Sequence, residues 1–157
     1  MPVESYAQKI QEQLGETWLP RIYRERILKL RTRSYHFENA KSSERVVIQH
    51  TLLGVELKVG RRRLLCPDLA TARYLSVFAR VGATDVAVPY DITKISHIAD
   101  ELESSWYRML LLVDQEAGKE SPRFRSRLRG LLIAEVREQI KAAGAGTRIP
   151  EFRLRKK

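Results

Sequence analysis

Two groups of polar residues near the middle of the chain carry side chains that could do chemistry. Glu56 and Lys58 are separated by one residue, in a run where apolar and polar residues alternate. Side chains alternate across a β-strand, so this carboxylate and this ammonium would share the polar face of one strand. Three consecutive arginines, Arg61, Arg62 and Arg63, follow Gly60. At a hairpin tip they could contact phosphates through bidentate hydrogen bonds, or form an ordinary polar turn that discourages edge-to-edge association of strands.

A second set of basic residues follows helical spacing further along the chain. Ser121 and Pro122 are a typical helix start, and apolar residues then recur at 124, 128, 132, 136 and 140 up to Gly144. The face roughly opposite this apolar stripe carries Arg123, Arg127, Arg137 and Lys141. The pattern predicts a helix with a basic outer surface.

The last segment, 145–157, looks irregular and predicts a flexible basic tail, with docking as an edge strand as the alternative. Its proposed binding residues are Arg153, Arg155, Lys156 and Lys157. Replacing these four residues should weaken binding to a polyanion and lower its salt dependence.

The basic charge is unevenly distributed along the chain. The formal net charge is +10, and residues 1–66, 67–117 and 118–157 carry +6, −4 and +8. A concentrated excess of positive charge creates a field that attracts nucleic acid, acidic protein surfaces or anionic lipid. The charge alone does not select one of these partners.

The elements that must position these residues form a β-β-α-β pattern over residues 45–90. Apolar, β-branched runs predict strands before and after Gly54, with a returning strand at 64–66. The segment 67–81 predicts a helix that ends at Gly82, followed by a strand at 85–89 lying parallel to an earlier strand through a right-handed crossover. We therefore predict an α/β (α+β) fold with a small mixed sheet and one crossover helix.

Helices are expected on both sides of this unit. The spacing predicts N-terminal helices at 3–14 and 19–30, and an antiparallel helical hairpin from about 92 to 143. The N-terminal region interleaves arginines with Trp18, Tyr23, Tyr35 and Phe37, which suits either base stacking or an aromatic core. We expect a single domain over 1–144 and the tail over 145–157.

The segment Glu56-Leu57-Lys58, with the basic turn, helix and Ala-Val strand that follow it, resembles the second half of the catalytic core of the PD-(D/E)XK nuclease superfamily. The resemblance covers residues 55–89. It implies that Glu56 and an acidic residue of a preceding strand hold Mg²⁺, while Lys58 assists the attacking water or the transition-state charge. The upstream Asp of that family is absent, which leaves Glu44 or Glu38 in its place.

Several classes of protein are not indicated. The sequence contains no glycine-rich phosphate loop, nucleophile elbow or zinc-ligand spacing, and we predict no cofactor, with Mg²⁺ required only for a nuclease. Its single cysteine, Cys66, cannot form an internal disulfide. No apolar run reaches the roughly 20 residues of a spanning helix, and residues 1–4 lack the pattern of a signal peptide. We expect a cytoplasmic protein without a membrane partner, in an oligomeric state that the sequence does not determine.

The charge and its placement favour binding of RNA or DNA, mainly electrostatic and weakly sequence-specific. The proposed interface combines the N-terminal basic helix, the Arg61–Arg63 tip, the basic face of the C-terminal helix and the tail. Two alternatives remain: a metal-dependent nuclease, and an adaptor that binds an acidic protein partner through the helical hairpin. Whether the chain is an enzyme is left open.

Overall fold

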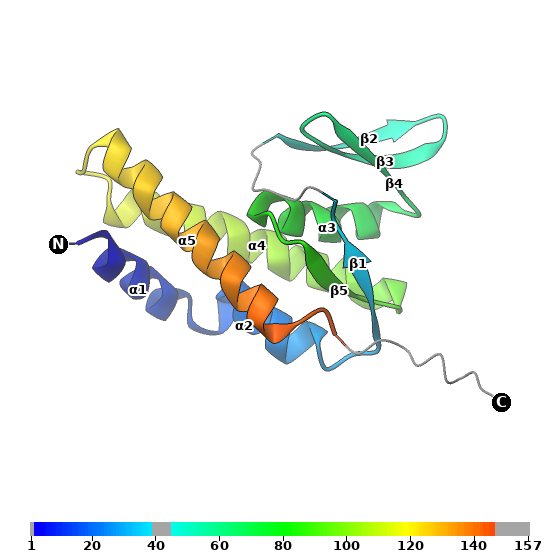
Figure 1. Ribbon diagram of the computed structural model, residues 1–157, viewed down its shortest axis with the longest axis horizontal. Helices are drawn as coiled ribbons and strands as arrows, with labels where there is room; N and C mark the ends of the chain where they lie inside the picture. The colour runs from blue at the N-terminus through cyan, green and yellow to red at the C-terminus, as the bar shows by residue number, and fades with distance from the viewer. Residues whose placement is uncertain (1, 39–44, 147–157) are drawn as a thin grey trace.

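Helices and two small antiparallel sheets make up the computed structural model, which describes residues 2–38 and 45–146 and has an α+β fold (Figure 1). Helices α1 and α5 lie beside α4 at one end, and α4 continues along α3 to the other end, where both sheets lie; α3 packs against the three-stranded sheet. The elements are α1 (Val3–Leu14), η1 (Gly15–Thr17), α2 (Leu19–Ile22), η2 (Tyr23–Ile27), β1 (Thr32–His36), β2 (Val46–Thr51), β3 (Gly54–Val59), β4 (Arg62–Cys66), α3 (Leu69–Val81), β5 (Asp85–Pro89), α4 (Ile92–Glu116) and α5 (Pro122–Ala143).

The predicted C-terminal helical hairpin is confirmed in α4 and α5. The Asp91 carboxylate accepts a hydrogen bond from the Thr93 amide (3.0 Å) and begins α4, while the Ser121 hydroxyl accepts one from the Phe124 amide (3.1 Å) and begins α5. Each helix buries one stripe of apolar residues between its neighbours. The buried stripe of α5 consists of Leu128, Leu132, Val136 and Ile140.

The central helix α3 follows the sequence signals closely. The Asp68 carboxylate accepts a hydrogen bond from the Thr71 amide (2.7 Å) at its start, and Gly82 ends it in the left-handed conformation (φ 84°). Its apolar face packs against the sheet in which β2, β3 and β4 are neighbours. Leu57 of β3 is fully buried beneath α3, as the alternation in that strand predicts.

The predicted parallel crossover and single mixed sheet are wrong. Strand β5 pairs with β1 in an antiparallel register that sets Ser34 opposite Ala87, so all strand pairs are antiparallel in the part of the chain that the structure describes. The other edge of β5 is closed by two tyrosines: the Tyr23 hydroxyl accepts a hydrogen bond from the Ala87 amide (2.9 Å), and the Tyr74 hydroxyl donates one to the Ala87 carbonyl (2.5 Å). Because both backbone groups are satisfied there, this edge offers no partner for a parallel strand.

The chain after α5 begins by packing against the β1–β5 ribbon. The Tyr23 hydroxyl donates a hydrogen bond to the Gly144 carbonyl (2.5 Å), and a side chain at Gly146 would collide with Thr32 and Ala87. The first two residues of the expected tail therefore lie on the fold. The rest of that tail, 147–157, lies outside the described residues. None of the described helices combines the length and apolar character needed to cross a lipid bilayer.

Candidate functional site

The predicted basic face of α5 forms a line of side chains along the helix, which we call the α5 stripe: Arg123, Arg127, Arg137 and Lys141. The four residues are 4, 10 and 4 positions apart. With 3.6 residues per helical turn, these spacings place all four side chains on nearly the same side of α5, opposite the buried apolar residues. Gly130 and Ala134 occupy the middle of the line, and a side chain added at Gly130 would meet open space. The α5 stripe is therefore a continuous surface with cations at its two ends.

Three members of the α5 stripe have no carboxylate partner within the described ranges 2–38 and 45–146. Arg123, Arg127 and Lys141 are exposed, and none of the ion pairs there includes them. Arg137 is half-buried and its Nη1 donates a hydrogen bond to the Val81 carbonyl (3.1 Å) at the C-terminal end of α3. That bond places a cation at the negative end of a helix and fixes the direction of the guanidinium.

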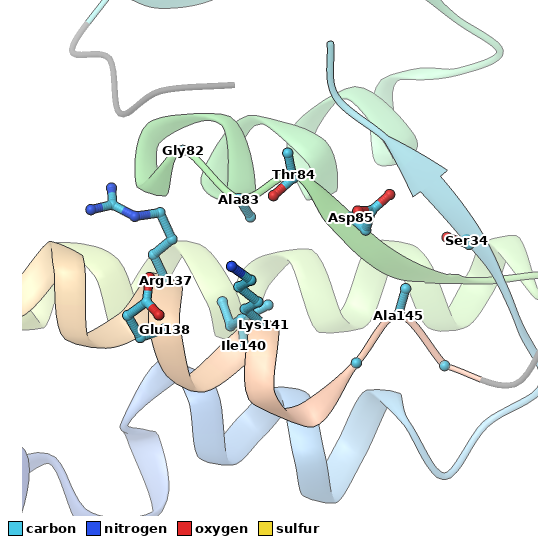
Figure 2. Close-up of a pocket in the computed structure, with 12 residues that line it drawn as sticks. Ser34, Gly82, Ala83, Thr84, Asp85, Arg137, Glu138, Ile140, Lys141 and Ala145 are labelled. Carbon is cyan, nitrogen blue, oxygen red and sulfur yellow. The ribbon is translucent and has the colours of Figure 1, made fainter. Parts of the chain in front are cut away.

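A hollow of about 590 Å³ lies beside the C-terminal half of the α5 stripe. Figure 2 shows Arg137 and Lys141 reaching from α5 toward the loop that follows α3, with Thr84 and Asp85 on the opposite wall and Ser34 at one end. Its volume falls in the range of known ligand sites, about 300–1,000 Å³. Two cations and two hydroxyls are donors suited to phosphate oxygens.

The carboxylates beside this hollow limit where an anion could sit. Asp85 Oδ1 lies 2.8 Å from Nδ1 of His36, and both side chains are exposed. Glu138 stands next to Arg137 on α5 and also lines the hollow. A phosphate is therefore best accommodated on the side of Lys141 and Arg137, away from Asp85.

The three consecutive arginines do not form a shared tip. Arg61 is exposed in the turn between β3 and β4, while Arg62 and Arg63 belong to β4 and point to opposite faces of its sheet. Arg62 Nη1 donates to the Glu38 carbonyl and its Nη2 lies 3.3 Å from Glu38 Oε2; Arg63 Nε lies 3.8 Å from Glu56 Oε1. Figure 1 places α3 between this sheet and α5, so these arginines and the α5 stripe are separate surfaces.

The residues implied by the nuclease resemblance are not gathered into a metal site in the described structure. Glu56 and Lys58 share the outer face of the sheet as expected, but the other candidate Glu38 is bound to Arg62 on the inner face. Glu44 lies outside the described residues. No group of three potential metal ligands occurs among residues 2–38 and 45–146, and β5 joins β1 rather than the sheet that carries Glu56.

The aromatic residues of the N-terminal region are mostly core. Trp18, Tyr23 and Phe37 are buried, and the Trp18 indole donates a hydrogen bond to Gln139 Oε1 (2.9 Å). Tyr35 is half-buried against Phe37 with a ring-centroid distance of 4.9 Å. Trp18, Tyr23 and Phe37 therefore belong to the core and do not offer stacking surfaces, whereas Tyr35 keeps part of its side chain exposed.

Sequence reasoning missed an exposed aromatic at the end of β5. The Tyr90 ring is 47% exposed, and the guanidinium carbons of Arg31 and Arg33 each lie 5.7 Å from its centroid. In the sequence, Tyr90 only follows a strand-ending proline, and nothing local brings it beside Arg31 and Arg33. The β1–β5 pairing does so, and the Tyr90 amide donates a hydrogen bond to the Arg31 carbonyl (3.1 Å).

Four of the five acidic residues of α4, namely Asp100, Glu101, Glu103 and Glu116, are paired with cations from other helical elements. Arg73 Nη2 of α3 lies 2.6 Å from Glu103 Oε1 and also contacts Asp100. The hydrogen bond from Arg73 to Glu103, followed in importance by the one to Asp100, raises the pKa of the Arg73 guanidinium. At the other end of α4, Lys9 Nζ lies 2.7 Å from Glu116 Oε1, and the hydrogen bond from Lys9 lowers the pKa of that carboxyl. These charges hold helices together and are not available to a ligand.

No protein-family model, no curated protein and no solved structure matches this chain.

Proposed function

We propose that this protein binds nucleic acid, with the α5 stripe as its main contact to the phosphate backbone. The observation that carries the proposal is the absence of carboxylate partners for Arg123, Arg127 and Lys141 in the described structure, where the carboxylates of α4 are largely paired. A cation without a partner keeps its full charge for a ligand and loses no existing ion pair on binding.

The geometry of the α5 stripe suits an extended polyanion. Arg123 and Lys141 are 18 residues apart, which corresponds to about 27 Å along a helix. Phosphates of a nucleic-acid strand recur every few ångströms, so a strand lying along α5 meets several of these cations at once. The hollow receives a phosphate from the same strand on the side of Lys141 and Arg137. Contacts to phosphates alone position the strand and give little sequence preference.

The first test is binding of labelled single-stranded RNA and duplex DNA, followed by fluorescence anisotropy with Mg²⁺ at 50 and 200 mM salt. With four phosphate contacts, the affinity for a single strand should fall about 50-fold between these salt concentrations. Intact probes on a gel afterwards support a binding protein. Cut probes would instead assign Glu56 and Lys58 to catalysis, and a lack of binding at low salt would turn the search to an acidic protein partner.

A matched pair of variants then tests the surface. The first replaces Arg123, Arg127 and Lys141 with Gln, and the control replaces Arg24, Lys29 and Arg108, which are exposed cations on other surfaces. Both variants lose the same charge. The first should bind about 10- to 100-fold more weakly at about 100 mM salt, and the control should stay within about 3-fold of the wild type. Equal losses would mean that only the net charge matters and would contradict the assignment to α5.

A further inference from the structure

A second, smaller hollow lies on the other face of the β1–β5 ribbon. The strand register puts Arg33, Tyr35 and Val88 on the face opposite to Ser34 and Ala87. The hollow has a volume of about 290 Å³ and opens between β1, the end of β4 and the start of α3. Its walls are mainly apolar, from Tyr35, Leu65, Cys66, Leu75 and Val88, and Arg33 lines it as well.

Arg33 connects this hollow to the exposed ring of Tyr90. Arg31 immediately precedes β1 and Arg33 is its second residue; the two side chains lie two residues apart, leave the same side of the chain and both reach Tyr90. Neither arginine has an ion-pair partner in the described ranges. Both guanidinium carbons lie 5.7 Å from the centroid of the Tyr90 ring, within the range of cation–π attraction, and no ion pair in the described ranges uses their N–H groups.

We propose that this hollow binds one unpaired base of a single-stranded nucleic acid, and that Arg31 and Arg33 hold the phosphate next to that base. The inference rests on the proposed nucleic-acid binding and specifies its substrate class. The whole site consists of the hollow, Arg31, Arg33 and Tyr90, and we call it the base site.

The size and chemistry of the base site fit a single base. The volume of about 290 Å³ is at the lower end of the range for ligand sites, which suits one planar heterocycle and excludes a base pair. Apolar walls suit the faces of a base, and stacking of this kind tolerates any base because each has a π-face. Bases inside a duplex are stacked and paired, so only an unpaired base can enter.

The charge around the base site also favours a phosphate. Burial raises the pKa of the Cys66 thiol, so the thiol is neutral at pH 7 and adds no negative charge beside Arg33. The two guanidiniums together match the charge and the planar hydrogen-bonding geometry of a phosphate. An isolated arginine pair on a flat surface would attract any anion, but the adjoining apolar hollow adds a requirement for a base.

The experiment compares three labelled probes of equal length with the full chain: a single strand, the same strand with abasic positions, and a duplex. The single strand should bind about 5- to 100-fold more tightly than the abasic strand, the range expected for one stacked base. Arg33→Gln and Tyr90→Ala should remove most of this difference, while Tyr90→Phe, which keeps the ring, should preserve it. Binding of the duplex should stay within about 3-fold of the wild type in these variants, because it depends mainly on the α5 stripe.

A second measurement uses the wild-type protein and so does not depend on a variant that folds. Cys66 is the only cysteine of the chain, lines the hollow and is only 5% exposed, so its slow alkylation in the folded protein proceeds through an open hollow and reports occupancy. Saturating single strand should slow alkylation several-fold, and saturating duplex should not. Equal alkylation rates with both probes, together with equal affinities for the intact and abasic strands, would overturn the base site and leave binding by α5 standing. If no probe binds at low salt, both the proposed function and the base site are wrong.

Discussion

The acidic residues of α4 and the basic residues of α5 belong to the same helical hairpin, but they are used differently. Carboxylates of α4 pair with Arg73 of α3, Arg26 of η2 and Lys9 of α1. These contacts join elements that are distant in the sequence. The cations at the ends of the α5 stripe contact no carboxylate among the residues that the structure describes.

This difference separates structural charges from charges available for binding. A paired charge in a half-buried contact contributes to the free energy of unfolding, and its removal leaves a partner without compensation. An unpaired exposed charge contributes little to folding and a great deal to the attraction of a polyanion. Mutations on the two helices should therefore affect different measurements.

The largest expected effect comes from charge reversal on α5. Replacing Arg123, Arg127 and Lys141 with Glu should weaken nucleic-acid binding by about 1,000-fold, because phosphates would then meet like charges. Fluorescence anisotropy measures the affinity, and circular dichroism checks that the helix content is kept. If the folded variant kept its affinity for nucleic acid, the α5 cations would not be the binding charges.

Removal of the main cation that faces α4 should affect stability instead. Arg73→Met leaves Glu103 and Asp100 without their partner and should lower the free energy of unfolding by about 1–2 kcal/mol. Arg108→Met, on an exposed side of α4, is the control and should change it by less than about 0.5 kcal/mol. Urea denaturation gives both values. Nucleic-acid affinity should stay within about 2-fold of the wild type in both variants.

Gly130 allows binding and stability to be varied separately within the α5 stripe. Gly130→Lys and Gly130→Glu should each stabilise the protein by about 0.5–1 kcal/mol, because the position is open and glycine is unfavourable within a helix. Lys should strengthen binding and Glu should weaken it, each by about 3- to 5-fold relative to Gly130→Ala. Thermal unfolding and anisotropy on the three variants measure the two effects. If Gly130→Lys and Gly130→Glu changed the nucleic-acid affinity in the same direction, the electrostatic account of α5 would be wrong.

The smallest effect is a difference in pH dependence. Glu116 has a lowered pKa in the folded protein because of Lys9, so this pair stabilises the fold above the usual carboxyl pKa of 4.5 and loses its contribution as the pH falls through the lower folded value. The melting temperatures of the wild type and Lys9→Gln should therefore differ by a small amount near neutral pH and converge in acid. Melting curves between pH 2 and 7 check this. Arginine and lysine stay charged throughout this range, so the cations of the α5 stripe do not titrate.

Local signals predicted much of the fold and the helix that carries the candidate site. Asp68, Ser121 and Gly82 act within one turn of their own helices, and the spacing of apolar residues in α5 determines which of its faces is buried and which is basic. Such features depend on neighbours in the sequence, so the sequence suffices to find them. The α5 stripe was predicted for this reason.

Contacts between distant residues explain what the sequence did not predict. The antiparallel β1–β5 pairing depends on Tyr23 and Tyr74, whose hydroxyls close the free edge of β5 from other elements. Arg62 is bound to Glu38 from before β2, which removes it from the predicted arginine tip. Tyr90 meets Arg31 and Arg33 only through the same strand pairing. No spacing rule along the chain encodes these encounters.

The number of phosphates contacted by α5 is the most direct test of the central claim. It is obtained from the slope of log Kd against log salt concentration, measured with a single strand for the wild type and for the variant with Gln at 123, 127 and 141. We predict that the magnitude of the slope decreases by about 2 in the variant, as expected for three lost contacts. The control variant, with Gln at 24, 29 and 108, should keep the wild-type slope. Identical slopes for the wild type and the α5 variant would contradict the claim that α5 binds the backbone.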